Sequence, residues 1–344
     1  MTLKEIRPQL EKALAFRSEQ GYLRPPFDSA CRLLNGFTEG VPDLAIDLFA
    51  RTVVIHHYGK DGGSRFVSAG EQNNLACFLT ETLPFVKAVI WKERASTDPI
   101  LRNGVLILGS KPDSRIREHT VRYAIDLQLN QDNSFYADTR LLRQWLLQKM
   151  KDKSVLNTFS YTGSLGTAAA AGGAKWVLQT DISEHFTEMA KRSFTLNRIY
   201  FNRRNFITGN FFPVISRLKR EGSLFDCVIL DPPFFSYSAK GSVNLATDPV
   251  GLVRKVRPLV ADHGFLILVN NSLYLSGEDF LKSIHAICDD QYLQFREMIP
   301  VPSDFTGVDP DYLKLYPANP APFNHPTKIA ILSVRRKDAR PSTF

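Results

Sequence analysis

Residues 154–181 read SVLNTFSYTGSLGTAAAAGGAKWVLQTD, and this stretch decides the expected fold. A short apolar run at Val155 and Leu156 leads into a turn-forming group at residues 160–163. An alanine-rich run of strong helix formers follows, and a second β-type run covers residues 176–178. Because parallel strands need such a helical crossover, the pattern predicts the first βαβ unit of a doubly wound α/β sheet.

A glycine and an aspartate lie where such a sheet binds its ligand. Gly163 lets the backbone approach a ligand closely, and Asp181 can accept two hydrogen bonds from a ribose diol. The turn has neither the Gly-x-Gly-x-x-Gly pattern of dinucleotide sites nor the Gly-x-x-x-x-Gly-Lys-Ser/Thr pattern of triphosphate sites. S-adenosylmethionine carries a ribose without a phosphate and fits both observations. The alternative is an α/β turn with a solvated aspartate.

A second apolar run, FDCVIL at residues 225–230, ends directly in a proline-rich turn with the sequence Asp231-Pro232-Pro233-Phe234-Phe235. The proline pair stops the strand and stiffens the turn, so Asp231 is expected at the same sheet edge as Gly163 and Asp181. A carboxylate and an exposed carbonyl can accept hydrogen bonds from the amine or ring N–H of a base, and an aromatic ring can stack on a flipped base. The alternative is a strand-ending turn without chemistry.

Composition bounds the class of protein. The chain has 344 residues and four cysteines, far apart in the sequence, which suits about two domains in a reducing compartment. No apolar run reaches membrane-spanning length, and the start MTLKEIRPQLEKAL lacks a signal-peptide core, so we expect a cytoplasmic protein without a membrane partner. The net charge of +8 favours a polyanionic partner such as RNA.

Three parts are expected along the chain. Residues 1–26 read as a helix and linker, and residues 27–115 as a β-rich domain with short strands at 44–48, 52–57 and 88–91 and a helix at 71–82. Residues 116–344 form the third part. The adjacent His56 and His57 point to opposite faces of a strand, so we interpret them as structural residues rather than as a shared metal site.

Flanking segments supply further candidate cofactor contacts. In SFYADTR, residues 134–140, Phe135 can lie against adenine or methionine and Arg140 can orient acidic groups; an ordinary helix start is the alternative. A helix at 184–197 and a strand at 206–208 follow the βαβ unit, and then Asn210 and Phe211 can meet the adenine amide edge and ring.

The C-terminal third is expected to complete the sheet. Asp248-Pro249 predicts the start of a helix to Val260, a fifth strand follows at 264–269, and residues 276–279 resemble a capping box. Strand-like runs at 292–300 and 329–335 predict a final antiparallel hairpin, which gives seven strands. The proline-rich connection 300–326 between them is a hypothetical lid.

Four motifs together resemble a known family: LNTFSYTGSLG, SFYADTR, DPPFFS and HPTKIAILSVRRKD. They look like the ribosomal RNA large-subunit methyltransferase family, whose 23S cytosine-5 enzyme has PUA, central β-rich (EEHB) and Rossmann-like class I methyltransferase domains. Arg32, residues 40–44 and Asp47 match the central domain, so the resemblance covers about residues 27–336. The 26 residues before it are too few for a PUA domain. The segment SFYADTR has Asn133 or Ser134 where the family has glycine.

The resemblance implies S-adenosylmethionine as cofactor, large-subunit ribosomal RNA as partner and an EEHB-like N-terminal domain; a homodimer stays open. The predicted cofactor site comprises Phe135, Arg140, Phe159, Ser160, Tyr161, Thr162, Gly163, Ser164, Asp181, Ile182, Asn210, Phe211 and Asp231. The predicted catalytic set comprises Asp231, Pro232, Pro233 and Phe234, with Asp231 and the Pro232 carbonyl orienting the base, Phe234 stacking on it and Phe235 shaping the pocket.

One loop lacks the cysteine that the reaction of the family's cytosine-5 enzymes requires. Those enzymes add a cysteine thiolate to the base, and that cysteine is expected after the fifth strand, where residues 270–272 read Asn-Asn-Ser. Cys227 lies inside a predicted strand and Cys288 late in a helix. We therefore predict methylation at a nitrogen by in-line displacement. The family also contains a guanine-N7 enzyme with a similar turn, and guanine N7, guanine N2 and adenine N6 stay open.

Three other functions stay open from the sequence. A small-molecule or protein methyltransferase would keep Gly163, Asp181 and Asp231 without needing the β-rich domain. A catalytically silent homologue would bind RNA or a ribosomal particle without methyl transfer. A nucleotide-dependent oxidoreductase is disfavoured by the missing glycine pattern.

Overall fold

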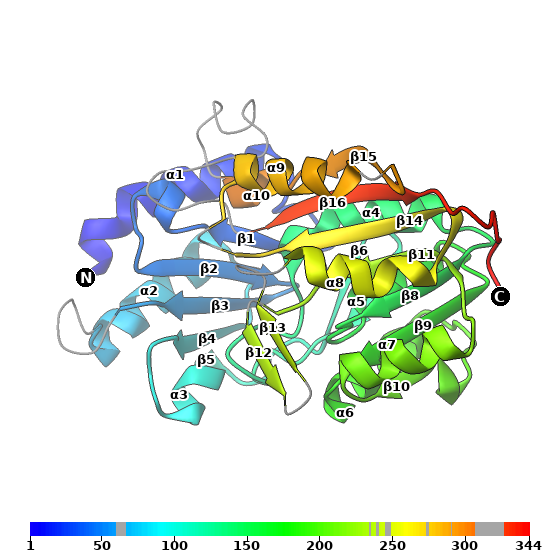
Figure 1. Ribbon diagram of the computed structural model, residues 1–344. Helices are drawn as coiled ribbons and strands as arrows, with labels where there is room; N and C mark the ends of the chain where they lie inside the picture. The colour runs from blue at the N-terminus through cyan, green and yellow to red at the C-terminus, as the bar shows by residue number, and fades with distance from the viewer. Residues whose placement is uncertain are drawn as a thin grey trace. The chain divides into compact units, whose positions relative to one another are not determined.

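The computed structural model, shown in Figure 1, describes residues 1–59, 67–233, 235–238, 241–244, 249–272, 275–289, 291–306 and 327–344. These residues fall into two compact units. The first contains residues 1–137 and 302–306, and the second contains residues 138–301 and 327–344. The boundary between the two units falls between Ala137 and Asp138. The predicted three-part division at residues 26 and 115 stays a proposal. No helix in the described ranges is long and apolar enough to cross a membrane.

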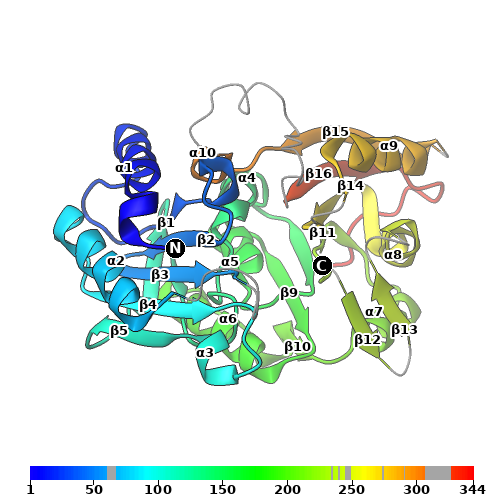
Figure 2. The same ribbon diagram turned by 90° about the vertical axis from the view of Figure 1, so that its left-hand side faces the viewer.

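The first unit is built on a mixed five-stranded sheet. Its strands lie in chain order: β1 (Ala30–Leu34), β2 (Leu44–Phe49), β3 (Thr52–His57), β4 (Ala88–Glu93) and β5 (Val105–Gly109). Only β3 and β4 pair in parallel, and α2 (Ala69–Thr82) connects them, as a parallel pair requires. The helix α1 (Leu3–Glu19) and α2 bury apolar side chains in the core on one face of this sheet (Figure 2). The predicted β-rich α+β character of this part is confirmed.

Short elements complete the first unit. They are η1 (Phe37–Glu39), α3 (Pro99–Asn103), the two-stranded ribbon of β6 (Arg115–Glu118) and β7 (Val121–Ala124), and α10 (Ser303–Thr306); η2 (Ala137–Thr139) spans the boundary to the second unit. α10 lies in the proline-rich connection predicted as a lid, and the rest of that connection, residues 307–326, lies outside the described residues.

Opposite the helices, the five-stranded sheet carries a buried polar cluster. Arg32 donates from Nε to Asp47 Oδ1 at 2.5 Å, and Asn133 Nδ2 lies 3.3 Å from Asp47 Oδ2 and 2.9 Å from His56 Nε2. Burial alone would raise the pKa of Asp47, but the charge of Arg32 and the contact with His56 lower it to about 2. Burial lowers the pKa of His56 to about 4. His57 instead contacts Glu93 at 2.6 Å, so the two histidines have different acidic partners.

Lys92 extends this cluster to a chain segment far away in sequence. Its side chain is fully buried, and Nζ donates to the carbonyl oxygens of Asn130 and Asp132, both at 2.9 Å. Burial lowers the pKa of Lys92 to about 7. Arg94 contacts Asp132 Oδ1 at 3.1 Å. The sheet therefore fixes residues 130–133, which directly precede the SFYADTR segment.

Replacing Lys92 with methionine is expected to lower the free energy of unfolding by about 1–3 kcal/mol. Methionine keeps the apolar volume but leaves the half-buried carbonyl groups of Asn130 and Asp132 without their donor. The denaturant midpoint measures the effect, and Lys87→Met is the matched control because Lys87 is exposed just before β4. A Lys92→Met variant as stable as this control would show that Lys92 does not hold the segment.

The second unit is built on a seven-stranded sheet with the order β10-β9-β8-β11-β14-β16-β15. The strands are β8 (Ser154–Thr158), β9 (Trp176–Asp181), β10 (Phe206–Thr208), β11 (Phe225–Leu230), β14 (Val260–Asn270), β15 (Leu293–Ile299) and β16 (Lys328–Val334). The first five in spatial order are parallel, and β16 is antiparallel to both β14 and β15. The predicted Rossmann-like sheet with its terminal hairpin is confirmed.

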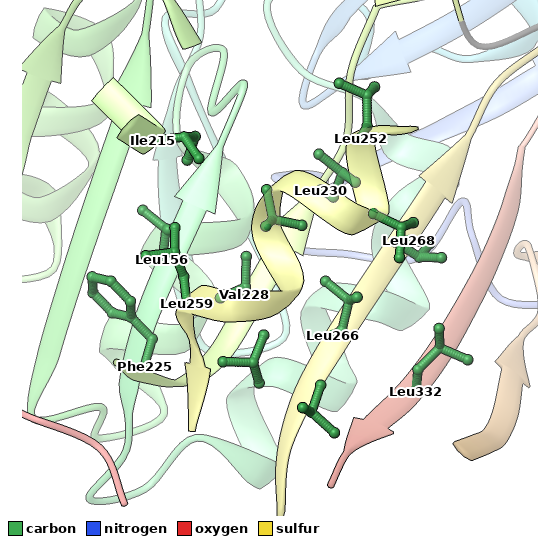
Figure 3. Packing of buried hydrophobic residues seen from close by; sticks show 14 of the residues in the cluster. Leu156, Ile215, Phe225, Val228, Leu230, Leu252, Leu259, Leu266, Leu268 and Leu332 are labelled. Atoms are coloured by element: carbon green, nitrogen blue, oxygen red, sulfur yellow. The ribbon is translucent and has the colours of Figure 1, made fainter. Parts of the chain in front are cut away.

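Helices cover both faces of this sheet. On one face lie α4 (Arg140–Lys149), α5 (Ser164–Ala171) and α6 (Glu184–Leu196), and on the other α7 (Phe211–Arg220), α8 (Pro249–Val256) and α9 (Gly277–Cys288). Figure 3 shows part of the core between this sheet and α7, α8 and α9, where Leu156, Val228 and Leu266 come from neighbouring strands. The alanine-rich α5 packs closely on α4, since a Cβ added at Gly172 would lie 2.4 Å from the carbonyl oxygen of Leu147.

One prediction near the proline turn is wrong. The helix predicted to reach Val260 ends at Val256, because η4 (Arg257–Leu259) follows and Val260 already belongs to β14. Between the proline turn and this helix the structure has a hairpin of β12 (Phe235–Ser238) and β13 (Gly241–Asn244), which was not predicted from the sequence. Asp248, the predicted cap of α8, lies outside the described residues.

Candidate active site

The five parallel strands of the second unit end at one edge of the sheet, and the segments that follow them form the candidate site. These segments are residues 159–163 after β8, 182–183 after β9, 209–210 after β10, 231–233 after β11 and 271–272 after β14. The carboxyl edge of a doubly wound sheet is where ligands bind. The predicted placement of Gly163, Asp181 and Asp231 at one edge follows from this strand order.

The turn after β8 has an unusual backbone. Phe159, Tyr161 and Gly163 have φ angles of 51°, 49° and 77°, in the left-handed region that only glycine adopts readily. A Cβ added at Gly163 would lie 2.4 Å from the Cβ of Ala190, so the turn also has no room for a side chain there. Residues held in such conformations cluster at functional sites, and this turn therefore has the character of a ligand cradle.

Asp181 joins the β8 turn to the end of β9. Its Oδ2 accepts the Tyr161 N–H at 2.8 Å and its Oδ1 accepts the Ser183 N–H at 3.0 Å. Burial raises the pKa of Asp181. Beside it, Ile182 is 69% exposed, a large apolar surface at the edge of the site. Ser160 Oγ is buried and has no hydrogen-bond partner among the described residues.

These features fit a ribose-bearing ligand with an apolar ring. Ser160 offers an unsatisfied hydroxyl, the carboxylate of Asp181 has acceptor capacity beyond its two backbone contacts, and Ile182 offers an apolar face. Thr162 is buried in the turn, and Ser164 opens α5, whose first N–H groups lack helical partners. S-adenosylmethionine therefore suits the residues present, through Ser160, Gly163, Asp181 and Ile182.

Asn210 and Phe211 have structural tasks that the sequence did not reveal. Asn210 Oδ1 accepts the Phe212 N–H at 3.1 Å and thereby caps α7. Phe211 is 7% exposed in the core and stacks on Phe159 with ring centroids 4.5 Å apart. Contacts of Asn210 or Phe211 with adenine stay predictions.

Phe135 and Arg140 fall in different compact units. Phe135 is buried in the first unit, where its ring lies 5.1 Å from that of Tyr123. Arg140 is buried at the start of α4 in the second unit. Their predicted contacts with the cofactor stay predictions.

Asp231 ends β11 at the centre of the edge. Its side chain is half-buried, Pro232 is buried and Pro233 is exposed, whereas Phe234 lies outside the described residues. Removal from water and the negative charge of Asp138 raise the pKa of Asp231 to about 7. A carboxyl group that titrates near neutral pH can work in both protonation states, which is typical of functional carboxylates.

Asp138 is a site residue that the sequence reasoning missed. It accepts a short hydrogen bond from the Thr327 hydroxyl, just before β16. Since β16 lies two strands from β11 in the sheet order, this contact places Asp138 over the edge near Asp231. Asp138 is the only carboxylate in the SFYADTR segment, so this motif could have indicated it as a site residue.

The loop after β14 holds no nucleophilic thiol. Asn270 Oδ1 accepts the Ser272 N–H at 2.9 Å, and Lys328 Nζ donates to the Ser272 carbonyl at 2.9 Å. Burial lowers the pKa of Lys328 to about 8. Cys227 lies in the middle of β11, paired with Val155 and fully buried, and burial raises the pKa of its thiol. None of the chain's four cysteines follows a strand at the carboxyl edge.

Comparison with known proteins agrees with this geometry. Residues 109–315 match the model of a family described as S-adenosylmethionine-dependent methyltransferase. The protein is 28% identical to ribosomal RNA large subunit methyltransferase I of Enterobacter sp. over 82% of this chain and 72% of that protein. It is 27% identical to YwbD of Bacillus subtilis, which carries a provisional name of the same kind, over 83% of this chain and 74% of that protein.

Solved structures show the same fold. SMU.776, which is described as a methyltransferase and was solved in complex with SAH, gives a TM-score of 0.81 at 20% identity, covering 97% of this chain and 82% of that chain. A tRNA m1G37 methyltransferase of M. jannaschii gives a TM-score of 0.55 at 14% identity, covering 95% of this chain and 79% of that chain. Because the family model spans more than half of the chain, this protein belongs to the S-adenosylmethionine-dependent methyltransferase family.

Proposed function

We propose that this enzyme transfers a methyl group from S-adenosylmethionine to a nitrogen of a base in large-subunit ribosomal RNA. Two relatives at 27–28% identity carry large-subunit ribosomal RNA methyltransferase names, which supports the RNA substrate. The observation that carries the nitrogen assignment is the composition of the carboxyl edge, where Asp231 lies in the predicted base-binding turn and no cysteine follows a strand. A cytoplasmic location and a homodimer stay predictions.

In this proposal, one set of residues at the carboxyl edge binds the cofactor and another set binds the base. Bound cofactor supplies a methyl group on a sulfonium, which a base nitrogen can attack directly through its lone pair. Gly163, Ser160 and Asp181 would hold it over the ends of β8 and β9. Asp231 and the Pro232 carbonyl would orient the base by accepting hydrogen bonds from its N–H groups. Positioning of this kind supplies most of the rate acceleration in such a displacement.

Methyl transfer is expected to increase as pH rises through about 7, because only ionised Asp231 is a pure hydrogen-bond acceptor. Asp138→Asn removes the negative charge that faces Asp231 and should shift this rise to lower pH. The measurement is kcat/KM against pH for both enzymes. Asp262→Asn is the matched control, because Asp262 lies near the amino end of β14, at the opposite end of this strand from the carboxyl edge. Coinciding profiles for Asp138→Asn and the wild type would contradict the coupling.

The RNA assignment is tested by transfer of labelled methyl groups in three parallel reactions, with large-subunit RNA, with intact large subunits and with a protein-free, RNA-free metabolite extract. The proposal expects label that ribonuclease releases from the first or second reaction. Label only in the metabolite reaction would replace the RNA substrate with a small molecule. Cofactor binding without label in any reaction would indicate a silent binding protein.

A further inference from the structure

A strongly basic stretch of the second unit carries its charged residues outside the carboxyl-edge segment 209–210. Residues 189–220 contain eight lysines and arginines and no aspartate or glutamate. They comprise the end of α6, the connection to β10, β10 itself and α7, at the lower right of Figure 1. The connection enters the amino end of β10, so it lies at the opposite end of this strand from Asn210. The cofactor site does not account for this charge.

Four arginines between Lys191 and Asn205 are exposed and lack acidic partners among the described residues. Lys191 pairs with Glu188, and Arg217 with Glu221. By contrast, no ion pair to a described residue is formed by the exposed side chains of Arg192, Arg198, Arg203 and Arg204. Their positive charge is therefore available to a polyanion. We define these four arginines and Tyr200 as the α6–β10 surface.

Tyr200 is 93% exposed although apolar residues surround it in the sequence. Its neighbour Phe201 points into the core and packs edge-on against Phe194 and Phe206, at centroid distances of 5.8 Å and 5.2 Å. The core under the connection is thus filled without Tyr200. An aromatic ring held outside on a fixed backbone is a surface on which a base can stack.

The backbone of the connection is ordered by its own hydrogen bonds. Arg198 lies two residues after the last residue of α6 and has φ of 57°, and the Ile199 N–H donates to the Phe194 carbonyl at 3.0 Å. Glycine is the usual residue in this conformation after a helix, so a side chain is kept here at a conformational cost. The short helix η3 (Arg203–Asn205) is capped by Asn202, whose Oδ1 accepts the Arg204 N–H at 2.9 Å. Preorganised arginines lose less entropy when they bind phosphates.

We propose that the α6–β10 surface is a second RNA contact, which binds the phosphate backbone of the substrate RNA through its arginines and stacks an unpaired base on Tyr200. This proposal rests on the proposed function, since it takes RNA as the substrate. Four exposed guanidinium groups and one exposed aromatic ring on the same stretch of chain suit a single-stranded or looped RNA segment. Because the connection enters β10 at the end opposite Asn210, we infer that the surface docks a part of the RNA other than the target base.

The test compares RNA affinity of the triple variant Arg198→Gly/Arg203→Gln/Arg204→Gln with that of Lys4→Gln/Lys12→Gln/Lys87→Gln. The control removes the same charge from exposed lysines of the first unit that form no ion pair with described residues. The probe is fluorescently labelled large-subunit RNA fragments, and fluorescence anisotropy is measured over a salt series. We expect the triple variant to bind at least about tenfold more weakly, with a salt slope smaller by about 2–3, and the control to stay close to wild type. Tyr200→Ala should weaken binding about fivefold or more without changing the salt slope.

Arg198→Gly alone separates binding from folding. Glycine removes the conformational strain, so the melting temperature should stay equal or rise while RNA affinity falls. A triple variant that binds RNA like the control would overturn the proposal for this surface and leave the proposed function intact. Equal competition by polyglutamate and by unlabelled RNA would overturn the RNA assignment of the surface in favour of an acidic protein. Wild-type enzyme that binds no RNA and methylates only a metabolite would overturn the proposed function itself.

Discussion

Asp231→Ala is expected to reduce methyl transfer by about 100-fold or more while the protein stays folded. Asp231 directly follows β11 at the centre of the carboxyl edge, and alanine removes the acceptor that would orient the base. Cofactor affinity, measured by calorimetry, should change much less than the rate of transfer. Asp289→Ala, an exposed carboxylate at the end of α9, is the control and should keep wild-type activity.

The free energy of unfolding of Asp231→Ala should also depend on pH differently from that of the wild type. The pKa of Asp231 in the folded protein is raised to about 7, above its ordinary value of 3.8. Ionising this carboxyl therefore destabilises the fold, and stability is lost as pH rises from about 4 to about 7. Asp231→Ala should lose less stability than the wild type over this pH range. Full activity in Asp231→Ala would show that Asp231 is not the residue that orients the base.

Gly163→Ala is expected to destabilise the protein by about 2–5 kcal/mol and to abolish measurable cofactor binding. The residue has φ of 77°, and its new Cβ would lie 2.4 Å from the Cβ of Ala190, so the turn must move. Denaturant unfolding and calorimetry measure the two effects.

Gly222→Ala is the matched control for the backbone strain. Gly222 has a similar φ of 70°, but an added Cβ has no atom within 4 Å. It should cost only about 1–2 kcal/mol and leave cofactor binding unchanged. If both variants behaved alike, the close packing of the β8 turn would not be what shapes the cofactor site.

The sequence predicts this fold where local pattern and topology agree. Each parallel strand is a short apolar run, and the residue that ends the run is visible in the sequence. Topology then brings those ends to one edge, which is why Gly163, Asp181 and Asp231 were placed together correctly. The absence of a cysteine after β14 could likewise be predicted, because it needs only the strand boundary.

What the sequence could not predict depends on contacts between distant residues. Lys92 binds carbonyls at residues 130 and 132, and Asp138 binds Thr327, with no local pattern to indicate either contact. Asn210 and Phe211 were predicted as adenine contacts, but in the structure Asn210 caps α7 and Phe211 lies in the core. The hairpin of β12 and β13 was missed although residues 235–238 alternate aromatic and polar side chains, because each strand has only four residues.

The most direct test of the central claim is the identity of the methylated nucleoside. Large-subunit RNA from a strain that lacks this gene is incubated with the enzyme and isotope-labelled S-adenosylmethionine, digested to nucleosides and analysed by mass spectrometry, with Asp231→Ala in parallel. We predict label on a ring or exocyclic nitrogen of a base, lost in the variant. Label at C5 of cytosine would contradict the account, because the carboxyl edge holds no cysteine to form the required covalent intermediate.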